Sequence, residues 1–325
     1  MLTRLNNLWL QVSSATLYAV VGTFVCTYSA NSIPSPHKSS TSNSWSLIAG
    51  QKLDLLSTEK VATDYSLAQN FVNHYLKREP VAGLSADLTL EQAISVQTEF
   101  VQLLTSHLGP VVGYKAGLTN PIAQQRLNVS QPVRGVLLKQ MLLDNGAVVS
   151  ANFGARPQFE ADLMVRVGDE SINNAKTPQE VLAALDAVIP FLELPDLVFA
   201  PDFKPNAAAI VAINVGARLG VLGTPIPLAA TPEWEQRLGK VQVSLLNEDG
   251  EEIAKGDSTA LLGHPLKAVM WLRDDLKAAG IPLQPGDLLS LGTITPLMSP
   301  KAKTTIRARY IGLDTQPVEV SVTFE

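Results

Sequence analysis

From residue 111 to the C-terminal end, the chain consists mainly of short apolar or alternating segments that end in turn residues. Residues 241–246 (VQVSLL) alternate, and the turn residues 247–250 lead into a second short run, which predicts a β-hairpin. Residues 304–313 and 318–324 form two further predicted strands. Helix signals interrupt these strands irregularly, whereas a doubly wound sheet requires regular alternation of strand and helix. The pattern therefore predicts an α+β fold with a β-rich body.

Helix signals are strongest before this body. Residues 57–79 have apolar side chains three and four positions apart, and the capping box that begins at Thr89 opens a helix expected to end before Gly109. The β-rich body should therefore follow a helical N-terminal part. Inside the body, a second capping box at Thr177 predicts a helix that stops at Pro190, because proline disrupts a helix interior. A last helix is predicted over 265–279.

Composition excludes several classes of protein. With 325 residues, the chain is long enough to bury a large core. A net charge of −5 supplies no electrostatic attraction for nucleic acid, so no nucleic-acid partner is expected. The single cysteine, Cys26, rules out an intramolecular disulfide and any cysteine-based zinc site. The four histidines are scattered, so the ligands of any bound metal should be oxygen atoms.

The N-terminal segment differs from the rest of the chain. After Arg4 no charged residue occurs before Lys38, and residues 1–26 resemble a secretory signal or a short anchor. On that interpretation the protein is exported or membrane-anchored, and membrane contact runs through this segment alone; otherwise the segment is an extension outside the fold of a cytoplasmic protein. Residues 27–56 are rich in Ser and Pro and are predicted to be a linker. The catalytic domain would then comprise residues 57–325.

Three acidic residues suggest a metal site. Glu160 and Asp162 lie two apart in a predicted strand (156–167, RPQFEADLMVRV), so their side chains leave the same face. Taken alone, the pair is typical of a solvated strand face. Glu193, however, is flanked by Phe191, Leu192 and Leu194, where an unpaired carboxylate would be costly. If Glu193 is not simply paired with a basic residue, three converging carboxylates would favour Mg²⁺ or Mn²⁺.

Other segments of the sequence offer further candidate catalytic and substrate-binding residues. Lys115 follows Val111, Val112 and Gly113, so it is either a buried proton donor or anion clamp, or a lysine that extends from a strand end. Gly263 and His264 precede a helix whose free N–H groups would suit an anion. Gly292 and Thr293 follow an apolar strand and offer a close backbone approach and a hydroxyl.

Five segments together resemble one known family. They are GYKAGLTNPIAQQRLNVSQPVRGVL, RPQFEADLMVRV, IPFLELPDL, GDSTALLGHPLKAVMWLRDDL and PGDLLSLGTIT. In this order they resemble the 2-keto-4-pentenoate hydratase / 4-oxalocrotonate decarboxylase group of the fumarylacetoacetate hydrolase superfamily, over roughly residues 60–325. The resemblance implies a β-rich fold with a rolled sheet around the metal site, and a homo-oligomer.

The resemblance also implies an activity and a site. The family's metal-binding acids would fall on Glu160, Asp162 and Glu193, and its active-site lysine on Lys115. The substrate would be a small 2-hydroxydienoate or 2-oxo acid that chelates Mg²⁺ or Mn²⁺ through its carboxylate and 2-oxygen. The expected reaction is that of a hydro-lyase that acts in aromatic compound catabolism.

Two departures from the family pattern keep alternatives open. Asp162 stands where the family has a longer glutamate, and Val133 stands where related hydratases carry an acid near the substrate. Arg134, next to Val133, would instead bind a second carboxylate of the substrate. A 2-oxo acid decarboxylase, or an inactive descendant that only binds 2-oxo acids, therefore remains an alternative to the hydratase.

Overall fold

The computed structural model describes residues 63–325. The interpretations of residues 1–26 as a signal or anchor and of 27–56 as a linker lie outside the described residues. The chain is helical over 63–77, and the second predicted helix is α2 (Leu90–Leu108). Thr89 caps α2 with a reciprocal capping box to Gln92, as the sequence predicts.

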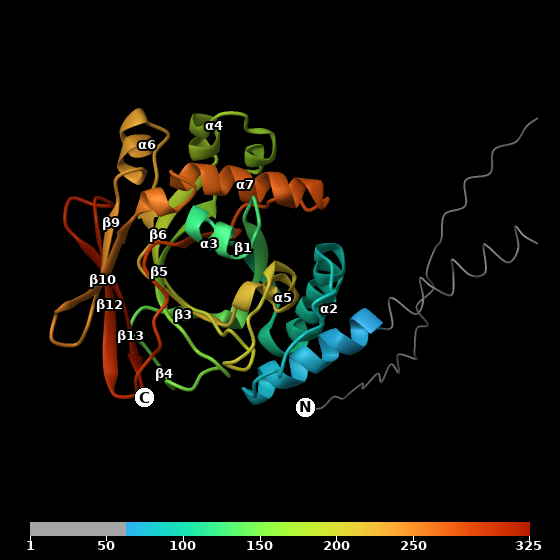
Figure 1. The fold of residues 1–325 in the computed structure, drawn as a ribbon. Coiled ribbons are helices and arrows are strands. Elements are labelled where there is room, and N and C mark those ends of the chain that lie inside the picture. The colour runs from blue at the N-terminus through green and yellow to red at the C-terminus, as the bar shows by residue number, and fades with distance from the viewer. Residues whose placement is uncertain (1–62) are drawn as a thin grey trace, which may run out of the picture. The chain divides into compact units, whose positions relative to one another are not determined.

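The larger of the two sheets is rolled (Figure 1). Its order is β2-β1-β11-β5-β6-β7-β3, and β8 pairs with β6 off this path. The strands are β1 (Val111–Gly117), β2 (Val133–Leu138), β3 (Leu142–Asp144), β5 (Glu160–Val167), β6 (Leu185–Leu194), β7 (Leu219–Leu222), β8 (Ile226–Pro227) and β11 (Leu288–Thr293).

The second sheet has five strands in the order β10-β9-β12-β13-β4. They are β4 (Ala147–Val149), β9 (Gln242–Leu246), β10 (Glu252–Asp257), β12 (Thr304–Ile311) and β13 (Val318–Phe324). The hairpin β9–β10 and the two C-terminal strands confirm the strand predictions for this region. Tyr310 of β12 joins the two sheets, because its hydroxyl donates to the carbonyl groups of Asp162 and Phe191.

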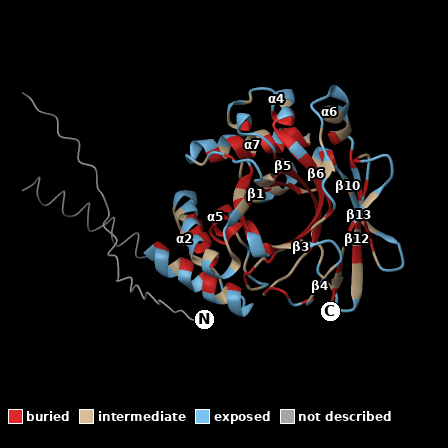
Figure 2. Ribbon diagram, turned by 180° about the vertical axis from the view of Figure 1, so that it is seen from behind, coloured by how far each residue is buried: buried red, intermediate tan, exposed pale blue. Residues whose placement is uncertain are grey.

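Helices cover the ends of the rolled sheet. α4 (Pro178–Ala183), α6 (Pro232–Leu238) and α7 (Pro265–Ala278) pack together, and α5 (Ala207–Ala212) packs on α2 (Figure 1). The short α3 (Pro121–Arg126) follows β1. Figure 2 shows that the strands of the rolled sheet are mostly buried, whereas the outer helices keep exposed faces. None of the helices described between residues 63 and 325 has the length and apolarity that a bilayer span requires.

One element was predicted wrongly. The helix expected from Thr177 to Pro190 ends at Ala183, and Leu185–Leu194 is the long central strand β6. The Pro190 carbonyl accepts a hydrogen bond from Gly223 N–H. Because the N–H and C=O of one residue in an antiparallel strand point to the same side, the side on which Pro190 lacks a donor is the side of Gly223. On that side β6 changes its partner from β8 to β7, and no ladder bond is lost. Tertiary pairing of an apolar run therefore prevails over the local helix signal.

Candidate metal and substrate site

Strand pairing brings two predicted metal ligands face to face. Glu160 on β5 and Glu193 on β6 are cross-strand partners, and Asp162 follows two positions along β5 on the same face. All three carboxylates are at least 96% buried. Burial excludes the alternative of a solvated strand face for Glu160 and Asp162.

Lys115 reaches this cluster from β1. Its ammonium group forms an ion pair with Glu193 and donates a hydrogen bond of 3.0 Å to the carbonyl of Val215. Only 3% of Lys115 is exposed. Lys115 is thus a buried cation and does not extend from a strand end into solvent. It is also the basic partner of Glu193 that the sequence left open as an alternative.

The Asp162 carboxylate points toward protein donors. Its oxygens accept hydrogen bonds from the Leu163 N–H and the Ser290 hydroxyl. Ser290 on β11 is fully buried and pairs with Lys115 across the strands. Sequence reasoning missed Ser290 and Tyr310, although a lone serine in the apolar run LLSLG signals a buried hydroxyl with a specific partner.

The cluster carries more negative charge than its one lysine balances. Burial and, secondarily, the neighbouring Glu193 raise the pKa values of Glu160 and Asp162 well above their ordinary values. The Thr293 hydroxyl bonds to Glu160 and opposes the shift, yet Oε2 of Glu160 is buried without a hydrogen-bond partner. An unpaired buried carboxylate oxygen is costly, and a cation would satisfy it.

These residues fit a divalent cation in their chemistry, although they do not yet surround one point. Within residues 63–325, no three His, Cys, Asp or Glu side chains are gathered as a ready metal site. The cause is local: Lys115 holds Glu193, and Asp162 is held by Ser290 and Leu163. Glu160 and Glu193 could hold Mg²⁺ or Mn²⁺ as direct oxygen ligands, with Asp162 as the adjacent acid.

A cavity of about 140 Å³ opens beside the cluster. Its polar lining consists of Lys115, Glu160, Glu193 and Thr293, and the rest is apolar, including Leu197, Phe199, Ile210, Ile213 and Leu297. Gly292 lies behind this lining: its φ is +109°, and an added Cβ would lie 2.4 Å from Thr119 Oγ1. The glycine thus permits close packing against Thr119 rather than direct contact with the cavity.

Besides Gly292, three of the five predicted substrate-binding residues do not line this cavity, so that only Thr293 does. Arg134 is ion-paired with Asp275 at 2.5 Å. His264 caps α7: Nδ1 accepts from Leu266 N–H, and Nε2 bonds to the carbonyl of Glu235. Gly263 forms the left-handed turn before this cap. The structure therefore brings Lys115, Glu160, Glu193 and Thr293 together, and leaves Arg134, Gly263 and His264 in structural contacts.

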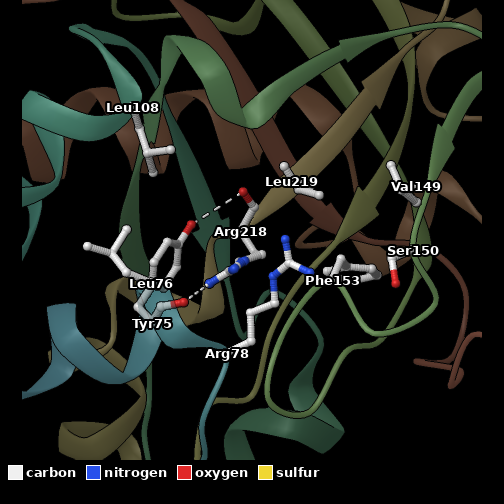
Figure 3. Close-up of a pocket in the computed structure, with 9 residues that line it drawn as sticks. All are labelled: Tyr75, Leu76, Arg78, Leu108, Val149, Ser150, Phe153, Arg218 and Leu219. Carbon is white, nitrogen blue, oxygen red and sulfur yellow. Dashed lines mark hydrogen bonds between the residues drawn. The ribbon is translucent and has the colours of Figure 1, made fainter.

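A second cavity, of about 300 Å³, lies between the helix 63–77 and strand β7 (Figure 3). Its buried cation, Arg218, already has partners: Nη1 donates to the Tyr75 carbonyl at 2.6 Å, and the guanidinium stacks 3.9 Å from the Tyr75 ring centre. None of the predicted site residues lines it. The smaller cavity beside the carboxylates is therefore the candidate site.

Divalent metal should stabilise the protein more strongly at high pH than at low pH. The pKa values of Glu160 and Asp162 are higher in the folded state than in the unfolded state, where they are about 4. Below pH about 4 the two groups therefore cost no stability, and the free energy of unfolding falls as pH rises through the folded-state pKa values. A bound cation reverses that loss, since it binds the ionised form. We expect Mg²⁺ to raise the melting temperature at pH 8 and much less at pH 5. An equal rise at both pH values, or an equal rise with NaCl of the same ionic strength, would contradict this expectation.

The chain is similar in sequence to known hydratases. The chain is 31% identical over 238 residues to 2-keto-4-pentenoate hydratase of Paraburkholderia xenovorans (strain LB400), across 72% of this chain and 86% of that protein. It is 28% identical over 221 residues to 2-hydroxyhexa-2,4-dienoate hydratase of Comamonas testosteroni, across 67% of this chain and 81% of that protein. No protein-family model matches the chain.

A solved structure has the same fold. The 4-oxalocrotonate decarboxylase from Pseudomonas putida G7, complexed with magnesium and adipate, matches with a TM-score of 0.72 and 26% identity, covering 81% of this chain and 98% of that one. This match confirms the α+β fold that was predicted for the chain.

Proposed function

The chain belongs to the 2-keto-4-pentenoate hydratase family, and we propose that it is a hydro-lyase that adds water to a small 2-hydroxydienoate with the help of Mg²⁺ or Mn²⁺. Two kinds of relative support this assignment: curated hydratases, and a structurally similar decarboxylase whose structure contains magnesium. Glu160 and Glu193 would hold the metal, with Asp162 beside them. The metal supplies Lewis-acid polarisation of the substrate carboxylate and 2-oxygen.

Lys115 is the proposed proton donor. It is the only basic side chain that lines the cavity among the described residues. We assign to its Nζ the proton that enters at C5 when the dienol becomes a 2-oxo-3-enoate; the proton that leaves the 2-hydroxyl group in this step restores the ammonium form of the lysine. Water then adds at C4, the β-carbon of the conjugated ketone, and a proton enters at C3, so that the net change is addition of one water. The buried position of Lys115 excludes bulk water from its ammonium group, which strengthens its attraction for an anionic substrate.

The apolar lining of the cavity favours hydratase over decarboxylase substrates. A dicarboxylate such as 4-oxalocrotonate brings a second charge, which would lie unpaired among side chains such as Leu197, Phe199 and Ile213. Arg134, which the sequence suggested for that charge, is paired with Asp275 instead. This single observation carries the choice of a monocarboxylate with an apolar tail.

Binding and turnover test the proposal together. Calorimetric titration of metal-stripped protein should show Mg²⁺ or Mn²⁺ binding, and oxalate, a chelating mimic of the enolate, should bind only when the metal is present. With metal present, 2-hydroxypenta-2,4-dienoate should be hydrated, whereas 4-oxalocrotonate should show a kcat/KM at least about 100-fold lower, on the order of the penalty for one unpaired buried charge. Preferential decarboxylation of 4-oxalocrotonate would favour the decarboxylase. Binding of metal and oxalate without any turnover would favour the inactive descendant.

A further inference from the structure

Three consecutive residues next to the cavity adopt a left-handed backbone. The φ values are +56° for Asn214, +54° for Val215 and +68° for Gly216. Asparagine and glycine tolerate this region, but valine is β-branched and rarely occupies it. Strain of this kind persists only where the surroundings impose it, and it concentrates at functional sites.

The Asn214 side chain ties this segment to the neighbouring strand β2. It is fully buried and bridges both backbone groups of Val136 on β2: Oδ1 accepts from the N–H at 2.8 Å, and Nδ2 donates to the carbonyl at 2.8 Å. Gln97 of α2 completes the arrangement, since its Nε2 donates to Arg134 O at 2.7 Å and to Asn214 Oδ1 at 3.3 Å. We call Gln97 and Asn214 the brace.

The strained segment presents one group to the site, the carbonyl of Val215. This oxygen accepts the 3.0 Å hydrogen bond from Lys115 Nζ. The other acceptor of Lys115 is Glu193, which is also a proposed metal ligand. When Glu193 binds a cation, the Val215 carbonyl is the acceptor that still directs the lysine.

Close packing around the lysine stem supports the same conclusion. Gly135 on β2 is the cross-strand partner of Lys115. A Cβ added at Gly135 would lie 2.8 Å from Lys115 Cγ and 2.9 Å from Asn214 O. The stem therefore passes between β2 and the strained segment, in a space that only glycine leaves open.

We propose that Asn214 and Gln97 are positioning residues for Lys115: the brace holds Val215 in its left-handed conformation so that its carbonyl keeps the lysine ammonium directed into the cavity. This inference rests on the proposed function for its catalytic meaning, but the geometry it claims can be tested separately. A segment that needed only a turn could place glycine at 215, whereas here a valine also contacts the cavity. The segment thus combines a cavity wall with a fixed hydrogen-bond acceptor.

The test compares two asparagines that make the same bridge. Asn214→Gly keeps a residue that suits a positive φ and removes the bridge. Asn173→Gly is the matched control, because Asn173 bridges Leu283 through its N–H and carbonyl at 2.9 Å each, away from the cavity. For Asn214→Gly we expect kcat to fall about 10- to 100-fold, with KM and Mg²⁺ affinity changed less than about 3-fold. For Asn173→Gly we expect a lower melting temperature and unchanged kcat. Gln97→Met should lower kcat in the same direction by a smaller factor.

A second readout does not depend on turnover. Acetic anhydride labelling, followed by mass spectrometry of the peptide that contains Lys115, should show slow modification in the wild type and in Asn173→Gly. Labelling should be faster in Asn214→Gly. Unchanged labelling and unchanged kcat in Asn214→Gly would overturn the proposal, and so would an equal loss of kcat in both asparagine variants. If the wild type hydrates no 2-hydroxydienoate, the proposed function fails, and the labelling result alone decides whether the brace positions Lys115.

Discussion

Replacing Glu160 by glutamine is expected to raise the melting temperature of the metal-free protein and to weaken metal binding by at least about 100-fold. The stabilisation follows because Glu160 is 4% exposed, its Oε2 has no hydrogen-bond partner, and Glu193 faces it across the strands. Removing one of two opposed buried charges relieves repulsion and desolvation. The loss of affinity follows because a direct ligand should cost at least as much as a supporting residue, for which losses of about 10- to 100-fold are usual.

The control for this variant is Asp196→Asn. Asp196 is equally buried, but its oxygens accept from the N–H groups of Ala155 and Arg156 at 3.0 and 2.7 Å. Neutralising a carboxylate that is already well paired should lower the melting temperature. Calorimetric metal titration and thermal unfolding of both variants provide the comparison. If Glu160→Gln lowered the melting temperature as Asp196→Asn does, or kept its affinity for Mg²⁺, Glu160 would be a structural acid.

The sequence predicted the acids more reliably than their pairing. Period-two alternation placed Glu160 and Asp162 on one face of a strand, and that face is buried. The sequence predicted a helix as far as Pro190, just before Glu193, whereas in the structure this segment is strand β6, which pairs directly with β5 and brings Glu193 opposite Glu160. Local helix propensity could not reveal this, since pairing partners far apart in the sequence decide the conformation of an apolar run.

Several residues that were singled out from a local signal alone do not lie at the cavity. His264 and Gly263 were noted because they precede a helix, and they do cap it, but the chain path takes this helix terminus away from the cavity. Arg134 was noted for its charge, but that charge is paired with Asp275, which lies 141 positions further along the chain. Conversely, Val215 acts on Lys115 through its backbone carbonyl, a contact that no side-chain pattern could have indicated. The chemical type of a residue is thus evident from the sequence, whereas long-range contacts determine which residues meet.

Replacing Lys115 by methionine should lower kcat by about 10²- to 10⁴-fold, the usual contribution of a general acid or base. Metal affinity should be retained or increased, because the lysine no longer competes for Glu193. The metal-free protein should be less stable than the wild type, since three buried carboxylates would then lack their cation. Steady-state turnover of a 2-hydroxydienoate, metal calorimetry and thermal unfolding measure the three effects. Turnover close to that of the wild type would reduce Lys115 to a structural ion-pair partner.

Lys115→Arg separates the two roles open to this cation. Arginine keeps the positive charge but does not release a proton at accessible pH, so it preserves an anion clamp and abolishes proton transfer. If Lys115 donates the proton that enters at C5, the arginine variant should bind oxalate in the presence of metal and still lose turnover as the methionine variant does. If Lys115 only attracts the anionic substrate, the arginine variant should recover most of the turnover that methionine loses. The Lys115 ammonium group lies at the cavity wall, where it is held by Glu193 and by the Val215 carbonyl. A proton donor must lie there, and we therefore expect the arginine variant to bind oxalate and to lose turnover.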